Sequence, residues 1–213
     1  MSLTDDLTLY HYWRSSSSWR VRLALALKGL TPQFVAVNLL DEETDQPAHR
    51  ARHPFGYVPV LEVGGGPRYL VESMAILEWL DEVKPEPHRL FPGDAWDRAH
   101  VRALCETVNA GIQPLSNPPG VERHSADSAE AQRWHQWVIH RGLAAYEGLS
   151  APRAGCFSLG DGVTAADCLL IPQVYNALRF NVDLSPYPTV ARIWAHSQGL
   201  PQFKVSHPDQ FKP

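Results

Sequence analysis

Strand-like patterns occur only in the first 72 residues of this chain, and every later pattern is helical. The early segments alternate apolar and polar side chains, or are rich in aromatic and β-branched residues, and a helical pattern lies between them. This order predicts an α/β region rather than an all-helical or all-β chain. The predicted elements are a strand at 7–13, a helix at 19–28, a strand at 34–40, a hairpin at 58–63 and 68–72, and a helix that begins at Ser73.

A proline-rich segment separates this region from the rest of the chain. It contains Pro85, Pro87 and Pro92, followed by Gly93, and is the best candidate for a linker. Beyond it, apolar residues recur at helical spacing, and the tryptophans of these segments are expected in the core. The sequence therefore predicts an α/β plus all-α chain. The predicted parts are an α/β domain at 1–83, a linker at 84–95 and an all-helical domain at 96–213, with helical patterns at 98–112, 132–149, 164–180 and 188–200.

Charge and cysteine content exclude several classes of protein. The net charge is −4 and no lysine and arginine stripe is present, so nucleic acid is not an expected partner. The first ten residues carry acids where a signal peptide carries positive charge, and no run approaches the roughly 18 apolar residues of a membrane span. The cysteines Cys105, Cys156 and Cys168 are odd in number and widely spaced, which favours a reducing cytoplasmic setting over a disulfide framework.

Four consecutive serines, Ser15 to Ser18, join the first predicted strand to the first predicted helix. The N-terminus of a helix favours negative charge by about 0.3–1 kcal/mol at an exposed site. Thiol–disulfide proteins place a low-pKa cysteine there, but this chain has only hydroxyls and all its cysteines lie in the helical half. A thiolate at this position must therefore come from another molecule, and a serine O–H would stabilise it. The alternative is a plain N-cap, and no G-x-S-x-G context favours a serine nucleophile.

Two other segments suggest what such a molecule looks like. Val58 precedes Pro59 and is held extended, so with a cis bond its amide and carbonyl could pair with a peptide-shaped ligand. Glu72 and Ser73 form another strand-to-helix junction, where Ser73 could hold a carboxylate and Glu72 an ammonium group. An edge-strand proline and a plain cap are the respective alternatives. Together the segments fit a thiol, an extended peptide and an α-amino-acid head, which are the three parts of glutathione.

Motifs throughout the chain resemble the zeta class of glutathione transferases. They are SSSSWRVRLAL, VPVL, ESMAI, NAGIQPL, GDGVTAADCLLIPQV and RFNVDLSPYPT. The resemblance runs from Tyr10 to about Pro208. It implies a thioredoxin-like glutathione-binding domain at 1–83, followed by a helical-bundle domain at 96–213 that contributes a site for an acidic substrate. It also implies a homodimer and glutathione as cofactor.

The resemblance carries functional roles to particular residues. Ser15, Ser16 and Ser17, with Arg14, are implied to be catalytic, and Ser15 is the preferred donor to the sulfur. Arg14 and Arg179 are implied to hold substrate carboxylates. The implied glutathione-binding residues are Ser15, Ser16, Gln46, Val58, Glu72, Ser73, Gln113 and Asn117. No metal is expected, because His49 and His53 stand at i, i+4 without a third ligand.

The sequence departs from the family pattern at several of these places. Ser17 stands where the family has cysteine, so rate or substrate range is expected to differ if that cysteine assists catalysis. Tyr57 and Glu72 each replace a glutamine. Pro118 and Pro119 follow Asn117 where the family has a less rigid segment, which puts that contact in doubt.

The implied activity is glutathione-dependent cis–trans isomerisation of maleylacetoacetate to fumarylacetoacetate, in the breakdown of tyrosine and phenylalanine. It would proceed by thiolate addition, bond rotation and elimination. Two alternatives stay open within the class, a maleylpyruvate isomerase and a general zeta-class transferase acting on small electrophiles or α-halo acids. A third alternative is a non-catalytic glutathione-binding protein.

Overall fold

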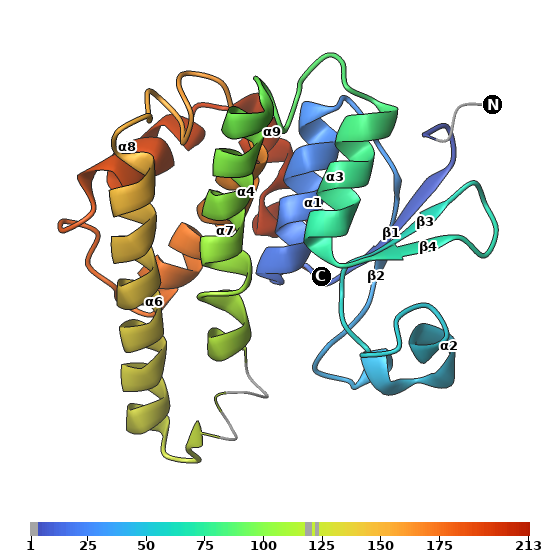
Figure 1. Ribbon diagram of the computed structural model, residues 1–213. Helices are drawn as coiled ribbons and strands as arrows, with labels where there is room; N and C mark the ends of the chain where they lie inside the picture. The colour runs from blue at the N-terminus through green and yellow to red at the C-terminus, as the bar shows by residue number, and fades with distance from the viewer. Residues whose placement is uncertain (1–3, 118–120, 122–123) are drawn as a thin grey trace. The chain divides into compact units, whose positions relative to one another are not determined.

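The computed structural model describes residues 4–117, 121 and 124–213, and its contacts divide the chain into two compact units (Figure 1). Unit 1 contains residues 1–90 together with 201–213, and unit 2 contains residues 91–200. Each unit has its own buried core and is described by itself below.

Unit 1 is built on a four-stranded mixed sheet in the order β2-β1-β3-β4. The central strand β1 pairs in parallel with β2 and antiparallel with β3, and Leu9 lies opposite Phe34 on one side and Leu61 on the other. Alternate residues of β1 are buried, as the period-2 pattern predicts. The strands are β1 (Leu7–His11), β2 (Gln33–Ala36), β3 (Val60–Val63) and β4 (Tyr69–Val71).

Two helices, α1 (Ser16–Leu27) and α3 (Ser73–Val83), pack against each other beside this sheet (Figure 1). Helix α1 begins three residues earlier than the periodicity predicts, because the Ser15 side chain caps its first turn. The short η1 (Glu43–Asp45) and α2 (Pro47–Arg50) follow β2. This arrangement confirms the predicted thioredoxin-like first domain.

The end of the chain also belongs to unit 1. Helix α9 (Pro201–Ser206) packs against α1, and η3 (Pro208–Gln210) follows it. The indole N–H of Trp19 donates to the Ser206 hydroxyl at 3.0 Å, and the Phe203 ring lies 5.4 Å from the Trp19 ring. The sequence analysis placed this segment in the helical domain, but these contacts group it with the sheet. A short helix has no periodic signature that would reveal its packing partner.

Residues after α3 are likewise tied to unit 1 rather than forming a loose linker. The Lys28 ammonium donates to Asp81 Oδ1 at 2.6 Å and to the His88 carbonyl at 2.5 Å. The Leu90 amide donates to the same carboxylate oxygen. The predicted linker at 84–95 therefore has a buried ion pair anchoring its first part.

The described residues of unit 2 form helices joined by turns, with isolated β-bridges around residues 154–162 and no strand. Helix α4 packs against α6 and α7, and α8 packs against both α6 and α7. This confirms the predicted helical region. Within the described part of the chain, no helix is long and apolar enough to cross a membrane. The helices are α4 (Ala95–Asn109), η2 (Gln113–Ser116), α6 (Ser128–Ser150), α7 (Ala165–Arg179) and α8 (Pro188–Ser197).

Helix α7 begins at the predicted capping box. The fully buried Asp167 carboxylate accepts hydrogen bonds from the amide and hydroxyl of both Thr164 and Ser158, at 2.5–2.8 Å. Burial nevertheless raises the pKa of this carboxyl above its usual range. The network fixes the start of the helix that ends at Arg179.

The expectation that the tryptophans of the helical half lie in the core is wrong: Trp134 and Trp194 are only half-buried, and the other two are exposed. Trp96 is 76% exposed and Trp137 is 52% exposed. The inward face of α6 is occupied by Val138, Ile139 and Leu143, so Trp137 faces outward. The guanidinium of Arg141 covers its ring at 5.1 Å.

Candidate functional site

The first part of the candidate site is the turn that leads from β1 into α1, residues Tyr12–Ser15, called the serine turn below. The Ser15 amide donates to the Tyr12 carbonyl at 3.1 Å, which closes the turn. The Ser15 hydroxyl oxygen then accepts from the Ser18 amide at 3.2 Å as the N-cap of α1. A hydroxyl that accepts in this way keeps its hydrogen for a second partner. The Ser15 hydroxyl can therefore cap the helix and donate a hydrogen bond to a ligand at the same time.

The four serines differ in their surroundings. Ser15, Ser16 and Ser17 are half-buried, whereas Ser18 is fully buried and its hydroxyl oxygen accepts from the Tyr12 amide at 3.4 Å. The amides of Ser16 and Ser17 carry no hydrogen bond in the described structure, as is usual in a first helical turn. An anion at this point would therefore meet amide donors and up to three hydroxyls. Arg14, on the same turn, is exposed, with its guanidinium 5.6 Å from the Trp13 ring.

The second part is the extended segment before β3. The Val58–Pro59 peptide bond is cis. Val58 is buried and packs with Tyr12 and Val37, which brings this segment against the serine turn. Among the described hydrogen bonds, none uses the amide or carbonyl of Val58. The His49 ring holds the preceding residue through Nε2, which donates to the Tyr57 carbonyl at 2.9 Å.

The third part is the junction between β4 and α3. Glu72 has a φ of 66°, a conformation that costs a non-glycine residue about 1–3 kcal/mol. Ser73 is buried, and its hydroxyl accepts from Arg20 Nη1 at 3.0 Å, so its hydrogen is also available to a ligand. The Glu72 side chain is 64% exposed and lies 4.0 Å from His53 Nε2. Burial lowers the pKa of His53, and Glu72 partly opposes that effect.

Gln46 lies apart from this group in its contacts. It is exposed at the start of α2, and its carbonyl accepts from the His49 and Arg50 amides. His49 of the same short helix bonds the Tyr57 carbonyl, next to Val58. His53, a few residues later, lies beside Glu72. His49 and His53 thus have structural partners. Among the described residues no group of three or more His, Cys, Asp or Glu side chains could hold a metal ion.

The predicted residues of unit 2 fall at two places. The Gln113 amide nitrogen donates to Asn117 Oδ1 at 3.0 Å, so the structure brings this pair together around η2. Pro118 and Pro119, which raised doubt about the Asn117 contact, lie outside the described residues. Arg179 is the last residue of α7, exposed, with Nη1 3.4 Å from Asn176 Oδ1.

Arg20 and Arg22 of α1 are not surface residues. They are 1% and 2% exposed, although their charge suggests salt bridges or subunit contacts on the outside. Arg20 reaches Ser73, and Arg22 reaches the carbonyls of the serine turn. In the sequence these residues are visible only as two arginines at i, i+2 in an otherwise apolar helix. Partners such as Ser73 and Ser206 are distant in sequence, so the sequence does not predict these contacts.

This chain is similar to one protein-family model and to two named isomerases. Residues 5–82 match the family model of the glutathione S-transferase N-terminal domain. The maleylacetoacetate isomerase of Mus musculus is 43% identical over 202 residues, covering 94% of this chain and 91% of that protein. The maleylpyruvate isomerase of a Ralstonia species is 41% identical over 208 residues, covering 95% of this chain and 97% of that protein.

A similar solved structure carries bound molecules. A crystal structure of maleylacetoacetate isomerase from Anaeromyxobacter dehalogenans 2CP-1 matches with a TM-score of 0.87 and 51% identity, covering 98% of this chain and 96% of that chain. It has dicarboxyethyl glutathione and citrate bound in the active site. The two isomerases and this crystal structure each match across both units, so these likenesses do not depend on the first domain alone.

Proposed function

We propose that this chain isomerises maleylacetoacetate to fumarylacetoacetate with glutathione. The premise is that the chain belongs to the zeta class of the glutathione S-transferase family. The observation that supports this most strongly is the serine turn. It places a hydroxyl with an available hydrogen at the N-terminus of a 12-residue helix, and the chain supplies no cysteine there. Such a site suits a thiolate brought by another molecule.

The residues of unit 1 fit the three parts of glutathione. Ser15 would face the sulfur, and the backbone of Val58 would pair with the cysteinyl amide. Ser73, at the N-terminus of α3, would hold the carboxylate of the γ-glutamyl group, and the exposed Glu72 carboxylate would meet its ammonium. Glutathione supplies the thiolate that adds to the cis double bond and leaves again after rotation.

The chain's task at the sulfur is to hold it ionised without holding it too strongly. A hydrogen bond from Ser15 and the amides of Ser16 and Ser17 favour the charged form. A thiol whose pKa lies near the ambient pH is both a competent nucleophile and a competent leaving group, which an addition and elimination sequence requires. Ser17, in place of the family cysteine, adds a further hydroxyl in the first turn of α1.

The substrate is acidic, and two arginines are proposed to hold its carboxylates. Arg14 lies on the serine turn itself and is exposed, so it can reach a molecule bound at the sulfur. Arg179 is proposed as the second carboxylate ligand, from unit 2, together with Gln113 and Asn117 as further glutathione contacts. Arginine suits this role because its planar fork binds a carboxylate with two hydrogen bonds.

The direct test is a spectrophotometric assay with maleylacetoacetate, with and without glutathione. The proposal expects loss of the cis substrate only when glutathione is present, without consumption of glutathione. Glutathione binding without turnover would instead support a non-catalytic binding protein.

Maleylpyruvate is a second candidate substrate, because the Ralstonia maleylpyruvate isomerase is nearly as similar to this chain as the mouse enzyme. The two substrates share a cis double bond and acid groups, and differ in one acyl group. The ratio of kcat/KM for the two decides between them. A ratio near one would make the two activities equally good descriptions.

We also propose a homodimer in the cytoplasm. Phe55 and Tyr57 are 70% and 50% exposed, and their rings stack with centroids 5.6 Å apart, which suits a contact with another protomer. Size-exclusion chromatography with light scattering should give twice the protomer mass. Phe55→Ser should shift the measured mass toward that of a single protomer. A wild-type protein of protomer mass would contradict the assembly.

A further inference from the structure

Arg22 is a buried cation that the mechanism above does not use. Its side chain is 2% exposed, and burial lowers its pKa to about 9, so it remains charged at neutral pH. Burying an arginine is costly unless its donors are bonded. The question is therefore what its guanidinium holds.

Two of the described hydrogen bonds of the guanidinium go to backbone carbonyls of the serine turn. Nη1 donates to the Tyr12 carbonyl at 3.3 Å and Nη2 donates to the Trp13 carbonyl at 2.9 Å. The Tyr12 carbonyl is the same group that accepts from the Ser15 amide. One arginine fork thus binds two carbonyls of the serine turn, and one of these also accepts from the Ser15 amide.

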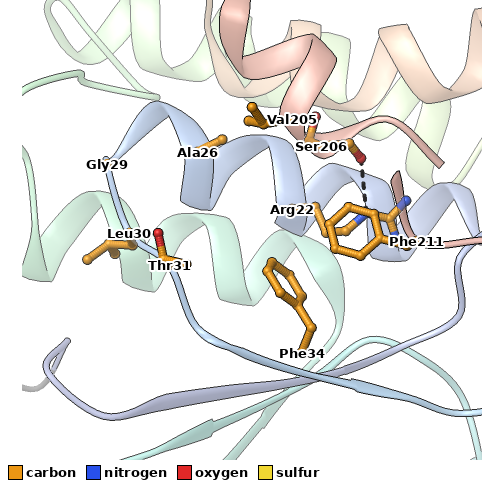
Figure 2. A pocket seen from close by; sticks show the side chains of 9 residues that line it. All are labelled: Arg22, Ala26, Gly29, Leu30, Thr31, Phe34, Val205, Ser206 and Phe211. Atoms are coloured by element: carbon orange, nitrogen blue, oxygen red, sulfur yellow. Dashed lines mark hydrogen bonds between the residues drawn. The ribbon is translucent and has the colours of Figure 1, made fainter. Parts of the chain in front are cut away.

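The other side of the guanidinium is held by the end of the chain (Figure 2). Nε donates to the Ser206 carbonyl at 3.1 Å, and the Phe211 ring lies 4.7 Å from the guanidinium carbon. Arg22, Ser206 and Phe211 are on the wall of a pocket of about 350 Å³, and Figure 2 shows the Phe211 ring against Arg22. The segment 201–213 therefore contacts the Arg22 side chain, which in turn bonds the serine turn.

The charge of Arg22 is not neutralised by an acid that the structure describes. Its remaining partner is His11 of β1, whose Nδ1 accepts from Nη1 at 3.1 Å because arginine has no acceptor. Burial, with Arg22 beside it, lowers the pKa of His11 to about 4, so this ring is neutral at physiological pH. His207, on the tail, pairs with Asp209 at 3.4 Å, and Lys212 and Arg14 lie over Trp13. The groups that accept hydrogen bonds from the guanidinium are thus all uncharged: three backbone carbonyls and a neutral imidazole.

We propose that Arg22 is a positioning residue that locks the serine turn and adds positive charge beneath it, so that the Ser15 hydroxyl and the amides of α1 stabilise a bound thiolate. This rests on the proposed function, because the thiolate is that of glutathione. The proposed contacts to the rest of glutathione, Val58 and Ser73, lie on other segments. Loss of Arg22 should therefore impair ionisation of the sulfur more than binding of the tripeptide.

The test measures the pKa of enzyme-bound glutathione from the ultraviolet absorbance of its thiolate, together with kcat and KM for glutathione. In Arg22→Gln, the pKa of the bound thiol should rise by about one unit, and kcat near neutral pH should fall about tenfold. KM for glutathione should change less than about threefold. Arg22→Lys keeps a cation but loses the fork, so its thiol pKa should lie between those of the wild type and Arg22→Gln.

Ser206→Ala is the matched control. It removes the hydroxyl that Trp19 bonds at 3.0 Å but keeps the carbonyl that Arg22 bonds. The tail loses one anchor, while the fork on the serine turn is unchanged. Its thiol pKa and kcat should match the wild type even if its melting temperature falls.

The outcomes separate the two proposals. If wild-type protein binds no glutathione, or binds it with an un-ionised thiol, the proposed function fails. If the wild type ionises the thiol and both Arg22 variants do so equally well, only the role of Arg22 fails. Should Arg22→Gln not fold, Arg22→Lys decides, because a wild-type thiol pKa without the fork contradicts the proposal. Equal shifts in Ser206→Ala would reduce the effect to loss of the tail.

Discussion

The two strand-to-helix junctions of unit 1 both place a serine over a buried arginine of α1, but they do so by different means. Ser15 stands outside its helix as an N-cap, in relaxed extended geometry, and Arg22 supports it through backbone carbonyls. Ser73 is already the first residue of its helix, and Arg20 bonds its hydroxyl directly. The residue before it, Glu72, has a positive φ.

This difference teaches what each junction is suited to hold. A half-buried cap with an available hydrogen suits a group whose charge comes and goes, such as a reacting sulfur. A buried, strained junction bonded directly to a cation suits a permanent anion that only needs to be held. The comparison therefore predicts that α1 substitutions act on rate and α3 substitutions on affinity.

The largest expected effect is that of Ser15→Ala. Loss of one donor to the thiolate should lower kcat/KM near neutral pH by about a hundredfold. Because the alanine also removes the N-cap, the free energy of unfolding should fall by about 1 kcal/mol. Steady-state kinetics against pH and chemical denaturation measure the two effects.

Ser15→Asp separates these roles. Aspartate is a good N-cap, so stability should be retained, but a carboxylate has no hydrogen to donate and repels the thiolate. It should be at least as inactive as Ser15→Ala. An active Ser15→Asp, or a fully active Ser15→Ala, would transfer the role to Ser16 or Ser17.

Acid should weaken the support of the α1 junction. The pKa of His11 is about 4 in the folded state, below its ordinary value of 6.5, so the unfolded chain binds the proton first as pH falls. Stability from this residue is complete above about pH 6.5 and declines toward pH 4. Between about pH 7 and pH 5, protonation of His11 in the unfolded chain should lower the free energy of unfolding by about 2 kcal/mol.

His11→Gln is the control for this prediction, since other histidines with lowered pKa values, including His53 at the α3 junction, also titrate in that window. Urea unfolding at the two pH values should show a smaller loss for His11→Gln than for the wild type. Equal losses in the two proteins would show that His11 is not protonated on unfolding in this range.

Ser73→Ala should act on affinity. Removing a hydrogen bond to a carboxylate costs about 1.5 kcal/mol, so KM for glutathione should rise about tenfold while kcat changes little. Isothermal titration calorimetry with glutathione checks the binding term, and Ser73→Thr should retain it. A loss in kcat equal to the loss in affinity would remove the distinction between the junctions.

The smallest expected effect is a gain in stability. Glycine adopts the Glu72 backbone conformation without strain, so Glu72→Gly should raise the free energy of unfolding by up to about 1 kcal/mol after its own entropic cost. Glutathione affinity should fall, because the partner of the ammonium group is lost. Glu72→Gln, which keeps the strain, is the matched variant and should show the affinity loss without the gain in stability.

Local chemistry made the junctions predictable from the sequence. Ser15, Val58 and Ser73 stand at places where a strand pattern gives way to a helix pattern or a proline, and such places are visible along the chain. Arg22 was not predictable in the same way, because one of its partners is the carbonyl of Ser206, 184 residues away in sequence. The tail's packing and the outward Trp137 were missed for the same reason, since periodicity shows that a face is apolar but not what covers it.

The central claim is that this protein holds the glutathione sulfur ionised at the serine turn. The most direct measurement is the pH titration of thiolate absorbance for glutathione bound to the wild-type protein. The account predicts a pKa at least about one unit below the 8.5 of an ordinary cysteine thiol. A bound thiol that titrates at the ordinary value, or no binding at all, would contradict it.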